Sequence, residues 1–234
     1  MEAMKKEPVW LNKNHPNYER WKRSRSLKYE RGRLVKQILE SEIELKEKTI
    51  LDAGSGEGGT SAVLLNDNFV VSSDISLVRL QRQAGDGIES LKILCNAAEH
   101  CFAEGVFDII ILQDVIEHIG ELDHLIEEIR LSLKPDGLLY LSTPNKHSII
   151  NFLSDPHWGL PFVSLMKRET LARKVLKFLR KDDADRKDLA ELLSLGDIRR
   201  LFASDFDLRL KTNFVANQLF QGHKGILWLS LIHI

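Results

Sequence analysis

The sequence contains little cysteine and no long apolar run. Its two cysteines, Cys95 and Cys101, match neither the spacing of a zinc site nor a disulfide framework, so we expect free thiols in a reducing compartment. No apolar run approaches the length of about 20 residues that a membrane-spanning helix needs. The chain begins MEAMKKE, which lacks the apolar centre of a secretory signal. These absences predict a soluble protein of the cytoplasm.

An excess of charge of either sign is also absent. The chain has 33 Lys and Arg residues against 34 Asp and Glu residues, a formal net charge of -1. A near-neutral chain has no general attraction to nucleic acid, so no DNA partner is expected. The length of 234 residues, of which 43% are hydrophobic, is enough for one large α/β domain with a full core.

Strand-like and helix-like segments alternate through the middle of the chain. Short apolar runs predict strands at 49–53, 69–74, 91–95, 107–112 and 137–142. Helical patterns lie between them at 60–65, 76–83 and 115–133, and a turn is predicted at 134–137. Alternation of this kind predicts βαβ units, and therefore an α/β fold with a Rossmann-like, doubly wound and mostly parallel sheet.

The segments on either side of this core differ from it. Residues 1–48 are polar and predict an N-terminal helical cap, with a helix from about 17 to 47. After the core at 49–145, residues 146–205 predict a helical insertion over the carboxyl ends of the strands, where ligands bind in open α/β sheets. We therefore interpret the insertion as a substrate lid. Strand signals return at 208–212 and 226–232.

The end of the first predicted strand is the most informative segment. A short apolar run ends in Asp52 and is followed by Gly54, Gly56 and Gly58. Glycines after a buried strand leave the backbone bare, so a ligand can approach it closely. The glycine spacing also fits a dinucleotide-binding fingerprint. A carboxylate at this strand end would repel a pyrophosphate and attract a cationic ligand, which favours a cofactor with positive charge.

Acid-x-Gly-x-Gly after a first strand resembles motif I of class I S-adenosylmethionine-dependent methyltransferases. The loop at Asn96-Ala97, the Phe107-Asp108 pair and the stretch Asp114-Val-Ile-Glu117-His118 are similar to later motifs of that family in order and spacing. The resemblance covers residues 49 to 145 and is closest to the quinone-biosynthesis O-methyltransferases. It implies a single domain with a seven-stranded sheet, an antiparallel last strand and a C-terminal hairpin over 206–234 that could be truncated.

The resemblance also implies which residues bind S-adenosyl-L-methionine. The turn would contact the methionine part of the cofactor, and an acid at the end of the second strand would accept both ribose hydroxyls. That acid alone does not separate this cofactor from NAD, because both contain the ribose. The implied cofactor residues are Asp52, Gly54, Ser55, Gly56, Asp74, Ile75, Asn96, Ala97 and Gln113. Asn96 stands where the family usually has an aspartate, and its side-chain oxygen can still accept from the adenine amino group.

Three residues are candidates for acid–base chemistry on the methyl acceptor: His118, His157 and Asp114. An acceptor hydroxyl needs a base within reach of its proton. In a second interpretation Asp114, Glu117 and His118 bind a divalent metal, with His157 as a fourth ligand. Certain quinone-pathway O-methyltransferases and small-RNA 2′-O-methyltransferases are similar at these positions. In a third, Glu117 and His118 only brace the start of the following helix.

Segment 164–181 is basic and amphipathic. It has seven basic residues against one acid, and an apolar stripe at helical spacing formed by Leu165, Ala172, Val175, Leu176 and Leu179. Such a helix can lie on an anionic membrane or contact a phosphate-bearing substrate. Alternatively, it packs its stripe on its own domain and leaves the lysines in water.

These patterns together predict an S-adenosylmethionine-dependent methyltransferase that methylates oxygen on a small-molecule, sugar or lipid-linked acceptor. Three alternatives stay open: a metal-dependent RNA 2′-O-methyltransferase, an NAD-dependent oxidoreductase, and a non-catalytic cofactor-binding module. The identity of the acceptor and the oligomeric state are not predicted.

Overall fold

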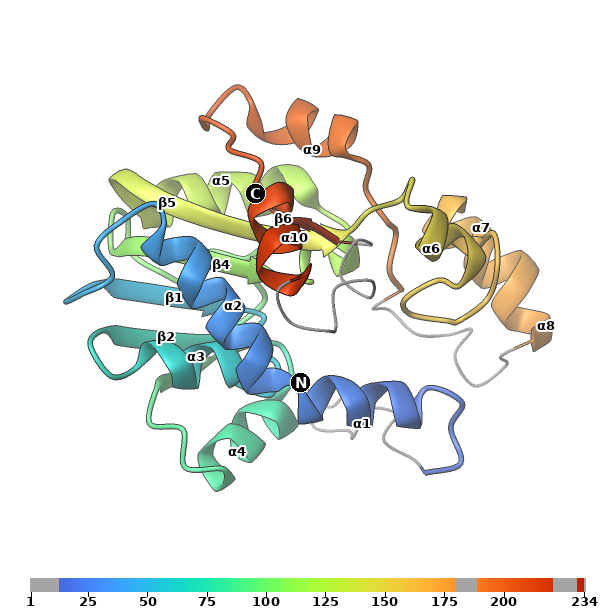
Figure 1. Cartoon of the computed structure of the whole chain (residues 1–234), viewed down its shortest axis with the longest axis horizontal. Helices are drawn as coiled ribbons and strands as arrows, with labels where there is room; N and C mark the ends of the chain where they lie inside the picture. Colours follow the sequence, from blue (N-terminus) through green and yellow to red (C-terminus); the bar gives the residue numbers. More distant parts are fainter. Residues whose placement is uncertain (1–12, 180–188, 221–230, 234) are drawn as a thin grey trace. The chain divides into compact units, whose positions relative to one another are not determined.

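A computed structural model describes residues 13–179, 189–220 and 231–233 (Figure 1). The chain divides into two compact units. The first unit contains Tyr18–Gln113 and Glu121–Leu141, and the second contains Asp114–Gly120 and the chain from Ser142 onward.

One sheet contains all six strands of the described residues, in the order β3-β2-β1-β4-β5-β6. The strands are β1 Thr49–Ala53, β2 Phe69–Asp74, β3 Leu91–Leu94, β4 Phe107–Gln113, β5 Leu133–Pro144 and β6 Leu231–His233. β1 pairs parallel with β2 and with β4, and β2 pairs parallel with β3. Within the second unit, β6 pairs antiparallel with the last three residues of β5. The first four strands begin where the sequence predicts, because each is a short apolar run between turn residues.

The predicted count of seven strands is wrong for the described residues. Segment 208–212 does not form a strand, and the helix α10, Thr212–Phe220, begins at its last residue. The predicted C-terminal hairpin therefore lacks its first strand. Most of segment 226–232 lies outside the described residues, and β6 overlaps only its end.

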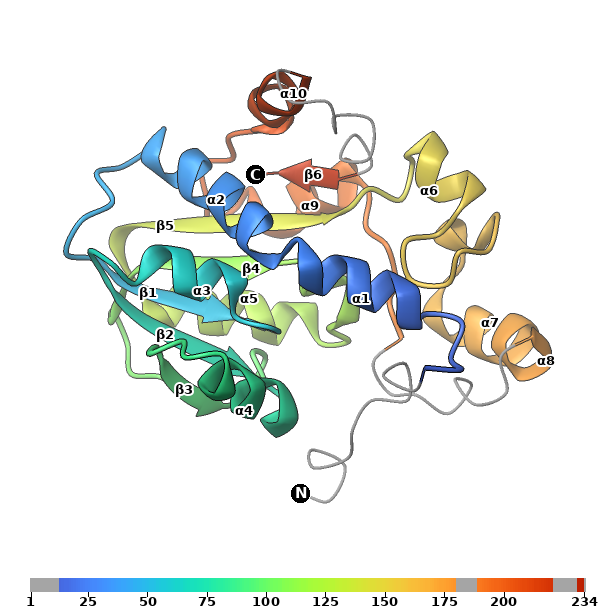
Figure 2. The ribbon, with the colours of Figure 1, turned by 60° about the horizontal axis from the view of Figure 1, so that its bottom comes forward.

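Helices cover both faces of the strands in the first unit. They are α1 Tyr18–Ser26, α2 Lys28–Glu40, α3 Gly59–Leu64, α4 Leu77–Gly85 and α5 Leu122–Ser132. Figure 1 draws α2 and α3 in front of the strands and α5 behind them, and the turned view in Figure 2 agrees. β4 is central and buries Ile109, Ile110, Ile111 and Leu112, as a strand covered on both faces should. The predicted N-terminal helix ends at Glu40, short of 47.

Two glycines let α2 and α3 approach closely. A Cβ on Gly32 would lie 2.6 Å from the carbonyl oxygen of Gly59 and 2.9 Å from Cα of Thr60, and a Cβ on Gly59 would meet the carbonyl of Lys28. Both obstacles are backbone, which cannot rotate away. The two helices can pack at this spacing only because Gly32 and Gly59 have no Cβ. The spacing in turn determines the position of the turn before α3.

Gly32→Ala should lower the free energy of unfolding by about 3 kcal/mol, because the added methyl overpacks a backbone contact. Urea unfolding of the purified protein measures this. Gly85→Ala is the matched control, since a Cβ there meets nothing within 4 Å. The control should leave stability unchanged or raise it by up to about 1 kcal/mol. Equal effects of the two substitutions would show that the contact does not limit the approach of the helices.

The predicted helix over 115–133 is wrong in its first third. The chain instead forms a short 3-10 turn, η3 Ile116–His118, and α5 begins only at Leu122. Gly120 separates them, and the carbonyls of Glu117 and Ile119 accept hydrogen bonds from a side chain, not from a helical backbone. The turn predicted at 134–137 lies inside β5, where Asp136 has a φ of 62°.

The second unit contains the predicted insertion. Its helices are α6 Ile149–Leu153, η4 Val163–Leu165, α7 Arg168–Leu171, the π-helical turn η5 Ala172–Leu176, α8 Lys177–Leu179, α9 Leu195–Phe202 and α10. A small core of Trp158, Val163, Leu171, Leu176 and Leu189 holds the middle of this region together. Trp158 is 3% exposed, so it packs as a structural corner.

The two cysteines form a disulfide, so the expectation of free thiols is wrong. Cys95 directly follows β3 and is buried, whereas Cys101 is exposed. The bond closes the loop that contains Asn96 and Ala97. A reducing compartment does not favour such a bond, so the cytoplasmic location stays a prediction. Within the described part of the chain, no helix has the length and apolar character that crossing a membrane requires.

Candidate functional site

The glycine turn of the first unit has the backbone that its sequence predicts. Gly54, Gly56 and Gly58 have φ angles of 71°, 55° and 70°, a region of backbone conformation that residues with a Cβ rarely adopt. The amide of Ser55 donates to the carbonyl of Ser73 at 2.9 Å, which ties the turn to the end of β2. The turn thus leaves β1, crosses toward β2 and enters α3, and it carries no side chain at Gly54, Gly56 or Gly58.

Asp74 holds this turn from the end of β2. Its Oδ2 accepts from the amide of Gly56 at 2.9 Å, and its Oδ1 accepts from the amide of Ser76 at 2.8 Å. Arg79 lies 3.8 Å from Oδ2. The side chain is buried, at 3% exposure. A carboxylate offers about four acceptor positions, so about two remain for a ligand.

Asp52, at the end of β1, is bound within the protein. Its Oδ2 accepts from the amide of Ser61 at 3.1 Å and from the Ser61 hydroxyl at 2.6 Å. Burial raises the pKa of Asp52 from 3.8 to about 6, the hydrogen bonds from Ser61 lower it, and the neighbouring charge of Asp74 raises it further. Asp52 therefore fastens the start of α3, a role that the sequence interpretation missed.

The raised pKa of Asp52 predicts a pH dependence of stability. The folded state holds this proton more tightly than the unfolded chain, so the contribution of Asp52 to stability is largest below about pH 4 and falls as the pH rises from about 4 to about 6. The loss attributable to this group is about 3 kcal/mol, since each pKa unit corresponds to about 1.36 kcal/mol. Asp52→Asn keeps an acceptor for Ser61 and should abolish the dependence.

Urea unfolding of both proteins between pH 4 and pH 7.5 measures this effect. The difference in unfolding free energy between native protein and variant should change through this window and level off above it. A difference that stays constant with pH would show that Asp52 ionises with its ordinary pKa.

Gln83 is a site residue that sequence reasoning missed. It is fully buried on α4, and its Nε2 donates to the carbonyl of Gly56 at 2.8 Å and to the Ser55 hydroxyl at 2.9 Å. Together with Asp74, it fixes both the amide and the carbonyl of Gly56. The residues on either side of Gln83 on α4 are at least partly exposed. From a single sequence, such a buried glutamine cannot be distinguished from one on the surface.

The other predicted cofactor residues lie near the carboxyl ends of the strands of the first unit. Ile75 follows β2 and is 50% exposed. The Asn96 oxygen accepts from the amide of Ala98 at 3.2 Å, and its amide donates to Glu99. Gln113 ends β4, and its Oε1 accepts from the hydroxyl of Thr60 at 2.7 Å. The first unit therefore places these residues on the loops that follow β2 and β3 and at the end of β4.

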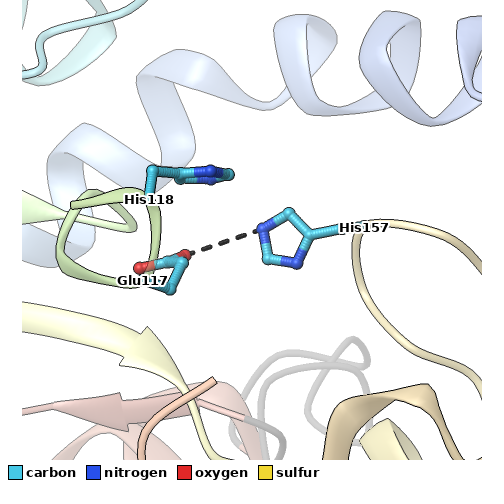
Figure 3. A group of neighbouring side chains, drawn as sticks. All are labelled: Glu117, His118 and His157. Carbon is cyan, nitrogen blue, oxygen red and sulfur yellow. Dashed lines mark ion pairs between the residues drawn. The ribbon is translucent and has the colours of Figure 1, made fainter. Parts of the chain in front are cut away.

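The second unit brings together Glu117, His118 and His157, which we call the carboxylate–histidine cluster. One potential ligand atom from each residue lies within 4.8 Å of the other two. Figure 3 shows Glu117 and His118 on the turn after β4 and His157 reaching them from a separate loop. The Nε2 of His157 lies 3.8 Å from Oε1 of Glu117, and the two imidazole rings are 4.9 Å apart, nearly perpendicular.

Local hydrogen bonds position each member of the cluster. Thr143 donates its hydroxyl to Oε2 of Glu117 at 3.0 Å, and Glu117 is buried, at 1% exposure. Asp155 accepts from the amides of His157 and Trp158, at 2.8 and 2.9 Å, and so shapes the loop that presents the histidine. His118 and His157 are both only partly buried.

Arg168, at the start of α7, clamps the turn that carries two of the cluster residues. Its Nη2 donates to the carbonyl of Glu117 at 3.2 Å and to the carbonyl of Ile119 at 3.1 Å. Glu191 accepts from the amide of Arg168 at 3.1 Å, and its own amide donates to the carbonyl of Glu117 at 2.8 Å. The insertion thus fixes the backbone on both sides of His118.

The cluster differs from the predicted metal set in one member. Asp114 is not part of it, because its amide donates to the carbonyl of Ser142 and its Oδ1 accepts from the Ser142 hydroxyl at 3.3 Å. Its φ of 56° turns the chain sharply after β4. His157 takes the third place. One carboxylate and two imidazoles suit a divalent transition metal, and the same groups can also accept a proton from an acceptor hydroxyl.

A family model described as "Methyltransferase domain" matches residues 22–208 of this chain. Among curated proteins, the chain is 34% identical over 105 residues to an uncharacterized protein of Methanocaldococcus jannaschii. That match covers 45% of this chain and 44% of the other. This chain is also 27% identical over 120 residues to a ubiquinone biosynthesis O-methyltransferase of Coxiella burnetii. That match covers 47% of this chain and 49% of the other protein. The chain thus spans less than half the length of these relatives.

Solved structures share the fold. A structure titled as an S-adenosylmethionine-dependent methyltransferase from Mesorhizobium loti gives a TM-score of 0.60 at 15% identity and covers 82% of this chain and 91% of its own. A structure titled as a SAM-dependent methyltransferase from Methanosarcina mazei gives a TM-score of 0.57 at 18% identity and covers 74% of this chain and 87% of its own. At these identities the likeness concerns the fold alone.

Proposed function

Because this chain belongs to the methyltransferase-domain family, we propose that it transfers the methyl group of S-adenosylmethionine to an oxygen atom of a small-molecule, sugar or lipid-linked acceptor. The observation that carries the proposal is the glycine turn held by Asp74. The bare backbone of Gly54 and Gly56 suits the methionine part of the cofactor, and the remaining acceptor positions of Asp74 suit the two ribose hydroxyls.

The polar groups on neighbouring loops fit the rest of the cofactor. Asn96 and Ala97 lie on the loop after β3, which the disulfide closes, and they would contact the adenine ring. Gln113 ends β4 and would lie beside the methionine end. The methyl group itself moves by in-line displacement, which needs the acceptor oxygen held within about 3–3.5 Å of it and water excluded.

The carboxylate–histidine cluster would serve the acceptor. His118 or His157 would take the proton from the attacking hydroxyl, and Glu117 would stabilise the imidazolium that forms. Asp114 directly follows Gln113 in the chain and would shape the turn between the cofactor residues and the cluster. Two imidazoles and a carboxylate are groups that can take the proton of an acceptor hydroxyl, which supports an oxygen acceptor.

Calorimetric titration of the purified protein with S-adenosylhomocysteine and with NADH tests the cofactor. We expect binding of the first and none of the second. Incubation with methyl-labelled S-adenosylmethionine and cell extract then tests transfer, with a heat-treated sample as control. Binding of NADH alone would favour an oxidoreductase, and binding of S-adenosylhomocysteine without any labelled product would favour a non-catalytic binding module.

A second candidate function is metal-dependent O-methylation, including methylation of an RNA 2′-hydroxyl. It is favoured by the convergence of Glu117, His118 and His157 from two segments, a donor set that fits Mn²⁺, Co²⁺ or Zn²⁺. A bound ion would lower the pKa of the acceptor hydroxyl. Labelled transfer in the presence of a chelator, with and without added Mn²⁺, separates this version from metal-free base catalysis.

A further inference from the structure

The helical segment 167–179 of the second unit buries one side. Leu171 and Leu176 are 2% and 0% exposed and belong to the small core of this unit, and Ala172 and Val175 pack against that core. Most of the apolar stripe predicted from the sequence is therefore used for packing within the unit. Leu171 and Leu176 are therefore not available to contact a partner.

The last residues of the same segment differ. Phe178 and Leu179, at the end of α8, are 74% and 64% exposed. Seven of the fourteen exposed large apolar side chains of the described residues lie between 149 and 179, so apolar exposure is concentrated in this insertion. A large exposed apolar group lowers the solubility of a protein and often marks an interaction site.

Positive charge surrounds these two side chains. Arg173, Lys174 and Lys177 are all exposed, and all three lie within five positions of Phe178 in the chain. Figure 1 shows α7 and α8 as one continuous coil, and the π-helical turn η5 lies between them. Glu169 is the one acid between Lys167 and Leu179, and it lies at the opposite end of the segment. We call Arg173, Lys174, Lys177, Phe178 and Leu179 the apolar–basic tip.

We propose that the apolar–basic tip docks on an anionic lipid membrane. Phe178 and Leu179 would enter the boundary between headgroups and acyl chains, and the three basic side chains would contact lipid phosphates beside them. An aromatic and an aliphatic side chain presented together among cations match such a boundary, which is apolar below and negatively charged above. This docking is independent of which acceptor the protein methylates.

Sedimentation of the whole protein with vesicles tests the proposal without an enzymatic assay. The protein should bind vesicles that contain phosphatidylglycerol and bind pure phosphatidylcholine vesicles far more weakly, and added salt should reduce binding. Substituting Lys174 and Lys177 together by Ala should weaken binding about 25-fold, because each basic residue near a charged surface contributes about fivefold. Phe178→Ser and Leu179→Ser should each weaken binding at least about tenfold.

Matched controls come from the first unit. Phe69→Ser removes an apolar side chain that is 57% exposed, and Arg33→Ala removes a cation that is 60% exposed. Both should bind vesicles like the native protein. All substituted positions are exposed, so circular dichroism should confirm an unchanged fold. The proposal fails if the native protein binds no vesicle, which is the result expected if the tip instead binds a protein partner. It also fails if the protein binds vesicles with and without phosphatidylglycerol equally well. Equal losses of vesicle binding in the control variants and the tip variants would contradict it too.

Discussion

Asp74→Ala should weaken the binding of S-adenosylhomocysteine at least about 100-fold. The change would remove the two charge-assisted hydrogen bonds that we propose Asp74 accepts from the ribose, each of which would contribute about 1.5–3 kcal/mol. It also removes the acceptor for the amide of Gly56, so the turn that we propose contacts the methionine part of the cofactor loses its support. Calorimetric titration measures the affinity directly.

Two further variants make the Asp74 experiment specific. Asp74→Asn keeps one acceptor oxygen and the shape of the side chain, so its loss of affinity should lie between the native protein and Asp74→Ala. Asp123→Ala removes an exposed acid on α5 and should have no effect. Thermal unfolding without ligand shows whether the turn variants stay folded. Unchanged affinity in a folded Asp74→Ala protein would remove the ribose role.

Glu117→Gln should reduce labelled methyl transfer at least about 100-fold, the usual contribution of a positioned acid–base group. Glutamine keeps an oxygen that can accept from Thr143, at 3.0 Å in the native protein, but it has no negative charge to hold an imidazolium or a metal ion. A side chain that only braces the turn would tolerate this exchange. The affinity for S-adenosylhomocysteine should be unchanged, because Glu117 is not among the proposed cofactor residues.

Histidine variants extend this comparison. His118→Ala and His157→Ala should lose transfer to a similar degree, whereas His124→Ala, an exposed residue on α5, should not. If Mn²⁺ stimulates the native protein and not the variants, the cluster binds metal. Full activity of a folded Glu117→Gln protein would leave the brace as the role of this residue.

The sequence predicted the cofactor half of the fold well because local patterns determine it. The first four strands are short apolar runs, and the turn after β1 is set by glycines whose positive φ angles suit few other residues. The methyltransferase family was recognised from these motifs, and the match over residues 22–208 confirms it. Predictions of this kind need only neighbouring residues.

Contacts between distant segments were less predictable. The helix expected over 115–133 is interrupted because Arg168, far along the chain, binds the carbonyls of Glu117 and Ile119. His157 joins Glu117 and His118 for a similar reason, since a turn at Asp155 determines where it points. The disulfide between Cys95 and Cys101, which are six positions apart, likewise follows from how the chain leaves β3, and the spacing of the cysteines does not reveal it.

Asp52 shows how a correct prediction can rest on an incomplete argument. The sequence suggested that its charge selects a cationic cofactor. Its carboxylate is instead buried, is bound by Ser61 and has a pKa of about 6, so much of its effect is structural. The family match, not this electrostatic argument, decides between a methyltransferase and a nicotinamide enzyme.

The clamp formed by Arg168 has a consequence for protein engineering. Exchanging the insertion for that of a relative is an obvious way to redirect such an enzyme toward a new substrate. Here the exchange would also remove Arg168 and Glu191, which hold the backbone around His118. A chimaera should therefore retain this pair, or else a transplanted loop will disturb the carboxylate–histidine cluster that we propose acts on the acceptor.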